Sequence, residues 1–305
     1  MPKPSIDTIL SEHALWLAGE GGKRADFSEM DLTGHDFSGA HLKRANFFRS
    51  HLGSARFPGA DLSEAYLCEA NLDGGFLSGA NLSGAMLMET SLKDANLEDC
   101  DAIGSDFSGA NLSGANLSGG NCSEANFSGA AMDGASLSRA DFNRAKLISA
   151  HLTGCDITAA SLSRANLYKA RLASADLSRA NLTGAMLIGA DLQDAMLDHA
   201  RMGDASLIGA NLGGAKLGKA KLAGANLTRA SFAGADLTEA DLSGATCDNT
   251  DFTSAMTKGA TLPFSDSGKP SAASLRAWIS GNPKMAVILL GIAVALALLS
   301  LYMKL

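Results

Sequence analysis

An unbroken period of five residues governs this sequence. From residue 25 to residue 262 a large apolar side chain returns at every fifth position, from Phe27 to Leu262, which makes 48 repeats without an insertion. The residue two places before each apolar centre is small, usually Ala, and the residue just before it is often Asp or Asn, as in Ala-Asn-Leu-Ser-Gly at 110–114. A repeat this regular must be the unit from which the fold is built.

The five-residue period fits neither regular secondary structure. On an α-helix each step of five residues turns the apolar side chain by about 140°, which spreads it around the whole cylinder. On a β-strand an odd step moves the side chain to the opposite face every time. All centres can point inward only if the chain turns a corner in every repeat. The sequence therefore predicts a coil of stacked turns with a shared core of Leu, Phe and Ala.

The phenylalanines indicate how many repeats make one coil. Eight Phe centres form pairs twenty residues apart: Phe27/Phe47, Phe37/Phe57, Phe107/Phe127 and Phe232/Phe252. An aromatic ring packs well over another ring in the next layer. The first two pairs also fit a ten-residue period, but Leu117 and Leu242 lie midway in the last two and exclude it. We therefore expect four repeats in each coil.

The A(D/N)LxX pattern of residues 25–262 resembles the pentapeptide-repeat family. The resemblance implies an all-β solenoid, a right-handed quadrilateral β-helix with four repeats per coil. Here it would have about 12 coils and, at about 4.8 Å per strand layer, a length of about 58 Å. The repeats depart from the family pattern at the centres Ala102 and Thr257 and at the small inward positions Met30 and His35. We expect Ala102 to thin the core and Thr257 to loosen the last coil.

Residues 1–24 form a leader before the repeats. The stretch 6–18 follows Ser5, a good helix N-cap, and places Ile6, Ile9, Leu10, His13 and Leu17 on one face of a helix. Because the open end of a β-helix exposes core side chains, we expect this helix to be the N-terminal cap. A helix that binds a partner is the alternative. The start of the leader lacks the long apolar core of a signal peptide.

The C-terminal segment predicts a membrane anchor. Residues 263–284 form a linker rich in Ser, Gly and Pro, and residues 285–303 are nineteen uncharged and almost wholly apolar residues, enough for a helix of about 28 Å. The positive-inside rule places the repeats in the cytoplasm, because Lys269, Arg276 and Lys284 precede the span and only Lys304 follows it. The alternative is a helix for dimerisation, since some family members pair through C-terminal helices.

Composition argues against several classes of function. The net charge of −7 gives no overall attraction to nucleic acid. The GxxxxGK motif at 213–219 lies in repeat register, not between a strand and a helix, and the residue after it is Ala220 where a phosphate loop needs Ser or Thr. A convex rod offers no deep pocket. We therefore expect no catalytic residues, no cofactor and no metal site.

Charge is segregated along the repeats. Between residues 61 and 133 there are twelve acidic residues and one basic residue, whereas basic residues dominate from 139 to 179 and from 201 to 229. We name these the acidic band and the basic half. The candidate partner surface comprises eight of their residues: Arg139, Arg144, Arg164, Arg179, Glu64, Glu69, Asp94 and Asp101. The alternative is a solvated surface with no partner.

Three functions remain open at this point. The first is a non-enzymatic, membrane-anchored scaffold that presents a protein-binding surface. The second follows from the resemblance, because some pentapeptide-repeat proteins mimic DNA and regulate type II topoisomerases. That role needs a surface that is acidic along its length, so the basic half argues against it. The third is a secreted effector that inserts into host membranes. The sequence favours the scaffold.

Overall fold

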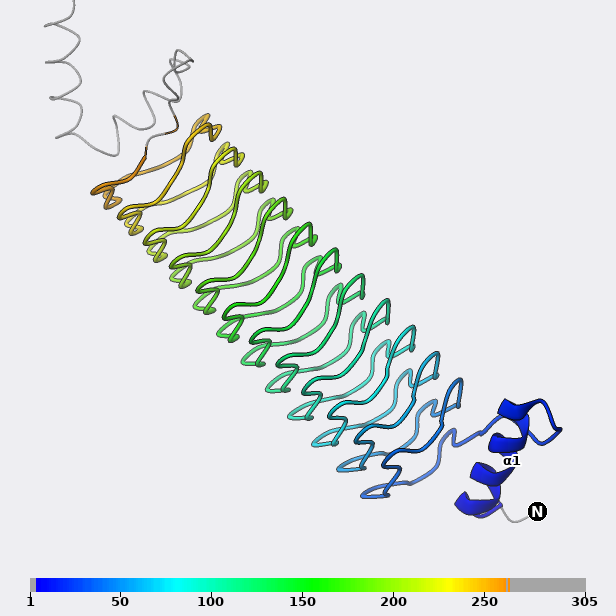
Figure 1. Cartoon of the computed structure of the whole chain (residues 1–305). Helices are drawn as coiled ribbons and strands as arrows, with labels where there is room; N and C mark the ends of the chain where they lie inside the picture. Colours follow the sequence, from blue (N-terminus) through cyan, green and yellow to red (C-terminus); the bar gives the residue numbers. More distant parts are fainter. Residues whose placement is uncertain (1–3, 262, 264–305) are drawn as a thin grey trace, which may run out of the picture.

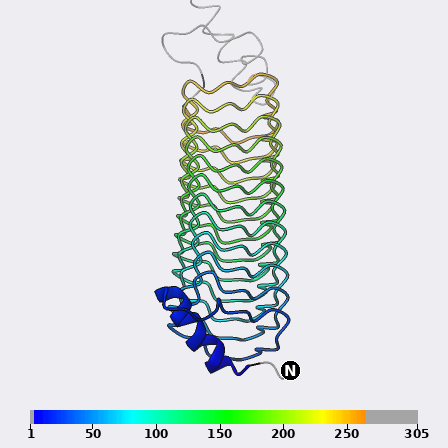
Figure 2. The same cartoon turned by 90° about the vertical axis from the view of Figure 1, so that its right-hand side faces the viewer.

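The chain folds into a straight rod of stacked coils with one helix at its N-terminal end (Figure 1). The computed structural model describes residues 4–261 and 263. The helix, α1, spans Ile6–Ala18, and parallel β-bridges link each coil to the next from Asp26↔Asn46 to Asp241↔Thr261. Each bridge joins residues twenty apart, which confirms the prediction of four repeats per coil. Figure 2 shows the coils lying nearly parallel to one another along the whole rod.

Four of the five backbone N–H groups in a repeat bond to backbone carbonyl oxygens. In the first repeat, the N–H groups of Phe27 and Glu29 donate to the next coil at 2.7 and 2.8 Å. The N–H of Met30 closes a turn onto the Phe27 carbonyl at 3.2 Å. The residue before the next centre donates back to the coil below, as Asn46 does to the Ala25 carbonyl at 2.9 Å. Stacking therefore satisfies most of the backbone, as burial requires.

The Asp or Asn of the repeat satisfies the fifth N–H. In the first repeat the Oδ1 atom of Asp26 accepts from the N–H of Ser28 at 3.1 Å. The same bond recurs up the rod, for example from Ser83 to Asn81 at 3.0 Å and from Ser243 to Asp241 at 2.9 Å. A short polar side chain that bonds to the backbone two residues on favours a turn. This bond explains why Asp and Asn precede so many centres.

The corner after each centre needs a left-handed backbone. The second residue after each centre has φ between 53° and 72° in the repeats, as in Gly114 at 69° and Arg139 at 60°. A turn with positive φ at its third residue favours Gly. Many corners carry a charged or polar residue instead of Gly. The left-handed conformation costs each of these residues about 1–2 kcal/mol.

The core is a continuous column of Leu, Phe and Ala. The paired phenylalanines stack as predicted, with ring centroids 4.9 Å apart for Phe27/Phe47 and 4.7 Å apart for Phe107/Phe127. Small and large centres also alternate within a coil. Each of the three small buried centres is followed directly by a buried Phe: Ala102 by Phe107, Cys122 by Phe127 and Cys247 by Phe252. The extra ring volume offsets the thinning that Ala102 was expected to cause.

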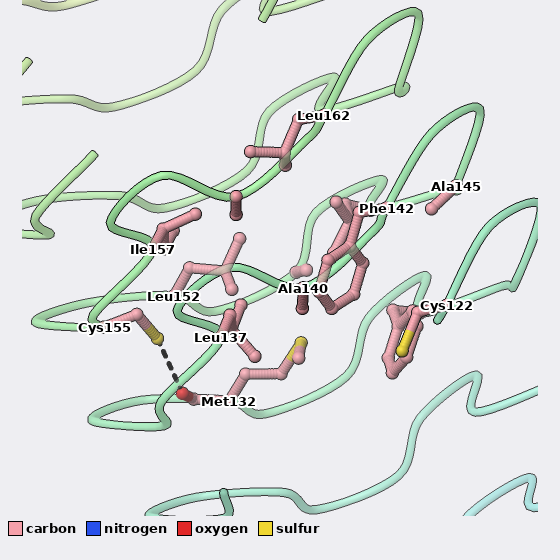
Figure 3. Close-up of a cluster of buried hydrophobic side chains, with 14 of the residues drawn as sticks. Cys122, Met132, Leu137, Ala140, Phe142, Ala145, Leu152, Cys155, Ile157 and Leu162 are labelled. Carbon is pink, nitrogen blue, oxygen red and sulfur yellow. Dashed lines mark hydrogen bonds between the residues drawn. The ribbon is translucent and has the colours of Figure 1, made fainter. Parts of the chain in front are cut away.

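Three polar residues at the small inward position bond to the coil below, whereas Ser50 and Ser105 bond to the preceding centre of their own coil. The Sγ atom of Cys155 donates to the Met132 carbonyl at 2.9 Å, within the cluster of Figure 3. Thr90 and Thr250 donate from the same position to the carbonyl oxygens of Leu67 and Leu227, each at 2.8 Å. Buried hydroxyl and thiol groups are therefore paired, as buried polar groups must be.

The helix α1 closes the N-terminal end, as the sequence predicts. Ser5 caps it through a bond to the N–H of Thr8, and Gly19 ends it in a left-handed conformation at φ 73°. Ile9 and His13 are buried against the first coil. The prediction for Leu17 was wrong: its side chain is 38% exposed, because the helix packs on the core from Ile6 to His13 and its last turn does not. Met30 and His35 are half-buried, since the first coil has no full coil beneath it.

The regular repeats continue to the C-terminal end of the described residues. Thr257 is half-buried, whereas the centres before it are fully buried. Within residues 4–261 and 263, no helix has the length and apolar character that a membrane crossing requires. The predicted span 285–303 and most of the linker 263–284 lie outside the described residues.

Candidate functional site

The four repeats of a coil form four sides of the rod. We name the sides after four successive centres: the Leu62, Leu67, Leu72 and Leu77 sides. Because each coil contains twenty residues, residues twenty apart lie on the same side in successive coils. The residue before each centre points outward from its side, and the two residues after the centre form the corner to the next side. Every outward residue can therefore be assigned to a side and a height.

The structure brings the four predicted arginines together around the Leu62 side. Arg144 and Arg164 occupy one corner of this side in successive coils, and Arg139 and Arg179 occupy its other corner, two coils apart. All four have φ between 58° and 61°, so each stands at a corner that Gly would occupy without strain. Of these four arginines, only Arg144 has an ionic partner among the described residues: Glu124, at 3.2 Å.

A shallow polar hollow lies between these corners. It has a volume of about 560 Å³, and both Arg144 and Arg164 line it. The rest of its lining comes from the carboxyl groups of Glu124 and Asp141 and from short polar side chains, among them Ser161, Ser163 and Thr183. Side chains of this kind offer hydrogen-bond donors and acceptors beside exposed guanidinium groups, a combination suited to carboxylate groups. The hollow is shallow and open to solvent, so it suits a macromolecular surface better than a small substrate.

The structure does not bring the four predicted acidic residues together. Glu64 and Asp101 belong to the Leu62 side and its corner, whereas Glu69 and Asp94 lie at two other corners. The acidic band therefore surrounds the rod. Part of it is also neutralised from the coil below, because Arg44 and Arg49 contact Glu64 and Glu69, each at 2.7 Å.

The carboxyl group of Glu64 bonds to two cations. Lys43 lies 3.1 Å from it, in addition to Arg44, and these bonds lower the pKa of Glu64. The acidic half of the predicted partner surface is thus weaker and more dispersed than the sequence indicated, because side chains one coil apart can reach each other.

A second surface was not predicted. Large apolar side chains, two of them exposed and three isoleucines half-buried, lie along the C-terminal half of the Leu67 side: Ile148, Tyr168, Met186, Ile188 and Ile208. Tyr168 and Met186 are 38% and 43% exposed, and the Nζ atom of Lys169 lies 5.2 Å from the centroid of the Tyr168 ring. We name these five residues the upper apolar ladder.

The N-terminal half of the same side carries a matching group. Its members are Phe48, Tyr66, Met86 and Met88, which we name the lower apolar ladder. The Phe48 and Tyr66 rings lie 5.7 Å apart, and Arg49 covers Phe48 at 4.7 Å. Phe48, Tyr66 and Met86 line a hollow of about 730 Å³ that is closed at one end by Trp16 of α1.

The other three sides carry far fewer large apolar residues. Their outward large apolar residues within the repeats are Ile103, Phe76, Met196 and Met256. A single exposed apolar residue is normal, but a row on one side marks an interaction surface. Sorting the outward residues by their position in a twenty-residue coil would have revealed both ladders in the sequence.

The remaining candidate motifs have structural explanations. The GxxxxGK stretch lies within regular coils, with Leu217 in the core and Lys219 3.7 Å from Glu239. The five cysteines are buried free thiols, and burial raises the pKa of both Cys155 and Cys247 to about 12. The part of the chain that the structure describes contains no cluster of His, Cys, Asp or Glu suited to a metal ion.

These features define a class of protein: a parallel β-solenoid with open side surfaces and corner charges. The family model for pentapeptide repeats matches the chain in eight copies between residues 23 and 255. The chain therefore belongs to the pentapeptide-repeat family, and its solenoid is a right-handed β-helix. No curated protein sequence matches the chain significantly.

Several solved structures are similar to this chain. HetL, a pentapeptide repeat protein involved in heterocyst differentiation regulation from the cyanobacterium Nostoc sp. strain PCC 7120, is 28% identical, with a TM-score of 0.34 over 85% of this chain and 95% of HetL. QnrB1, a plasmid-mediated fluoroquinolone resistance protein, is 18% identical, with a TM-score of 0.31 over 78% and 93% of the two chains. Rfr23 from the cyanobacterium Cyanothece 51142 is 34% identical over 30% of this chain and 58% of its own, with a TM-score of 0.26.

Proposed function

We propose that this chain is a non-enzymatic, membrane-anchored scaffold that binds an acidic protein on its Leu62 side. One observation carries the proposal: four arginines frame a single side of the rod, at corners where a side chain strains the backbone. Arg139, Arg164 and Arg179 have no ionic partner among the described residues. A cluster of exposed guanidinium groups attracts carboxylates and gives bidentate hydrogen bonds.

The proposed anchor is the apolar segment 285–303. Its nineteen residues match the hydrocarbon thickness of a bilayer, and basic residues dominate before it. In this arrangement the repeats lie in the cytoplasm, and the linker 263–284 separates the rod, with its Leu62 side, from the bilayer. A role as a DNA mimic is less well supported, because the arginines on this side would repel a protein groove that binds DNA.

A pull-down with the full-length protein tests the proposed surface. Reversing Arg139, Arg144, Arg164 and Arg179 to Glu should abolish partner capture at low salt, because four positive charges around this part of the side become negative. The captured partner should also dissociate as salt rises, since the Debye length falls to about 8 Å near physiological ionic strength. Capture that survives the four reversals would refute the proposal.

Two control variants separate charge from fold. Four basic residues elsewhere on the rod, Arg56, Lys93, Arg171 and Lys216, lie off the Leu62 side, so reversing them changes the net charge equally and should leave capture intact. Replacing the four corner arginines by Gly removes the charge and relieves the positive φ, so this variant should lose capture while its melting temperature stays the same or rises.

A further inference from the structure

We infer that the Leu67 side is a self-association surface on which a second copy of this chain packs antiparallel. The surface is centred on another side and shares with the Leu62 side only the corner that carries Arg144 and Arg164, so the inference goes beyond the proposed function and does not depend on it. Its apolar residues fall into two ladders, one in each half of the rod, separated by polar coils around Asn126 and Ser128. An interface between identical copies must be self-complementary about a twofold axis.

The geometry of a rod fixes which residues can meet. A twofold axis that lies in the interface, perpendicular to the rod, reverses the rod direction but keeps each column of outward residues opposite the same column. If the axis passes at the height of Asn126 and Ser128, the lower ladder of one copy faces the upper ladder of the other. Tyr66 then meets Met186, and Met88 meets Tyr168. A parallel pair would instead leave each ladder facing itself and would set Arg44 against Arg49 and Glu64 against Glu69.

Charges on this side are complementary in the same register. Going outward from the axis along the Leu67 side, Asp106 faces Lys146 of the other copy. At the corner toward the Leu72 side, Glu89 faces Lys169 and Glu29 faces Arg229. Because of the symmetry, each of these opposite-charge pairs occurs twice.

The corner toward the Leu62 side adds little repulsion. Arg44 faces Asp204 there, an opposite-charge pair, although Arg44 also contacts Glu64 of its own chain at 2.7 Å. Glu124 lies near the axis and faces itself, but each Glu124 already pairs with Arg144 of its own chain at 3.2 Å. Opposite charges therefore face each other at four positions, and the single like pair is neutralised within each chain.

Other registers fit less well. Moving one rod by a coil in one direction sets Arg49 against Arg229, a like pair. Moving it the other way keeps the ladders in contact but leaves Glu69 opposite Lys169 as the single opposite-charge pair on that corner. Apolar contact gives affinity, whereas charge selects the register.

The available area suits a reversible dimer. The ten spacings of about 4.8 Å between eleven coils, and three strand residues at about 3.3 Å, make a flat side of about 48 by 10 Å, or about 1,000 Å² for two copies. This value lies at the lower limit for a specific interface. The antiparallel pair places the two C-terminal ends at opposite ends of the assembly, so it suits rods that lie along a membrane surface and not rods that stand upright beside each other.

Cysteine cross-linking of the full-length protein in mild detergent tests the register. The double variant Glu89→Cys/Lys169→Cys should form a disulfide-linked dimer under mild oxidation, since residues 89 and 169 lie four coils apart within one chain and meet only between chains. Each single variant should give at least about tenfold less dimer. The matched control Asp99→Cys/Arg179→Cys has the same spacing on another corner and should remain monomeric. A dimer linked by Glu89→Cys alone, or equal yields in the control, would overturn the inference.

Charge reversal supplies a second measurement that does not depend on thiol chemistry. Sedimentation equilibrium should show a reversible dimer of the unmodified chain. Glu89→Lys or Lys169→Glu alone should raise its Kd about tenfold, because each creates two symmetric repulsive contacts. The double reversal restores opposite charges and should restore the Kd. A chain that stays monomeric at about 100 µM, or a double reversal as weak as the single ones, would overturn the inference.

Discussion

The Nδ1 atom of His13 accepts a hydrogen bond from the backbone N–H of Ala25 across 3.0 Å. In later coils the equivalent N–H closes a turn onto the preceding centre, as Ala45 does onto Leu42 at 2.9 Å. Ala25 is the first inward residue of the rod and has no such turn before it. The imidazole of α1 therefore takes the place of a missing carbonyl, and the cap continues the hydrogen-bond pattern of the coils.

This bond predicts a pH dependence for the cap. His13 must be neutral to accept at Nδ1, and burial lowers its pKa below the ordinary value of 6.5. Because the folded pKa lies below the unfolded one, the unfolded state takes up a proton first as the pH falls. The stability of the cap should be constant above about pH 6.5 and should decrease below it. Thermal melts between pH 8 and pH 5 measure this change.

The control for His13 is His13→Gln, whose side-chain oxygen can accept the same bond but does not titrate between pH 5 and pH 8. The difference in melting temperature between the two proteins should appear only below about pH 6.5. An identical pH profile for both proteins would show that His13 does not control the cap.

The five-residue register predicts opposite outcomes at two neighbouring positions. Leu162 is buried in the core, whereas Ser163 is half-buried at a corner. Leu162→Asp removes core packing and buries a charge between coils, so it should lower the free energy of unfolding by about 4 kcal/mol or more. Ser163→Asp should change it by about 0.5 kcal/mol or less. Denaturant melts that show equal losses would contradict the register.

The pairing of small centres with Phe predicts coupling between Ala102 and Phe107. Ala102→Leu should destabilise the rod by about 1–3 kcal/mol through overpacking. Phe107→Leu should destabilise it by about 1–2 kcal/mol through lost packing. Together they restore the Leu-Leu sequence of most repeats, so the double variant should be at least about 1 kcal/mol more stable than additivity predicts. Combining Ala102→Leu with Phe57→Leu, in a coil that Ala102 does not touch, should give additive losses.

Most of the fold could be predicted because the same five-residue pattern recurs in every part of the rod. The five-residue period excludes helices and flat strands, and the phenylalanine pairs select four repeats per coil. Stacking of Phe107 on Phe127 at 4.7 Å confirms that choice. The role of Asp and Asn could not be predicted from the pattern alone, because it depends on which N–H groups the stacked coils leave free.

The candidate surfaces were harder to predict, because they depend on how distant residues align. The four arginines lie near one another only once each residue is assigned to a side, and the sequence alone presented them as a band. Glu64 was predicted to belong to the partner surface, but Arg44 contacts it from one coil below. The two apolar ladders were missed for the same reason, since their members are spread from residue 48 to residue 208.

The last prediction concerns residues 285–303. A helix of nineteen apolar residues spans about 28 Å, and inserting it in a bilayer removes it from water along its whole length. The full-length protein should therefore stay with membranes during carbonate extraction, whereas a chain that ends at Asp266 should be recovered in the aqueous fraction. Replacing Leu290 and Leu296 by Arg tests the anchor within the full chain, because each charge at the centre of a span costs about 3 kcal/mol. If the full-length protein is extracted as readily as the shortened chain, residues 285–303 do not anchor it.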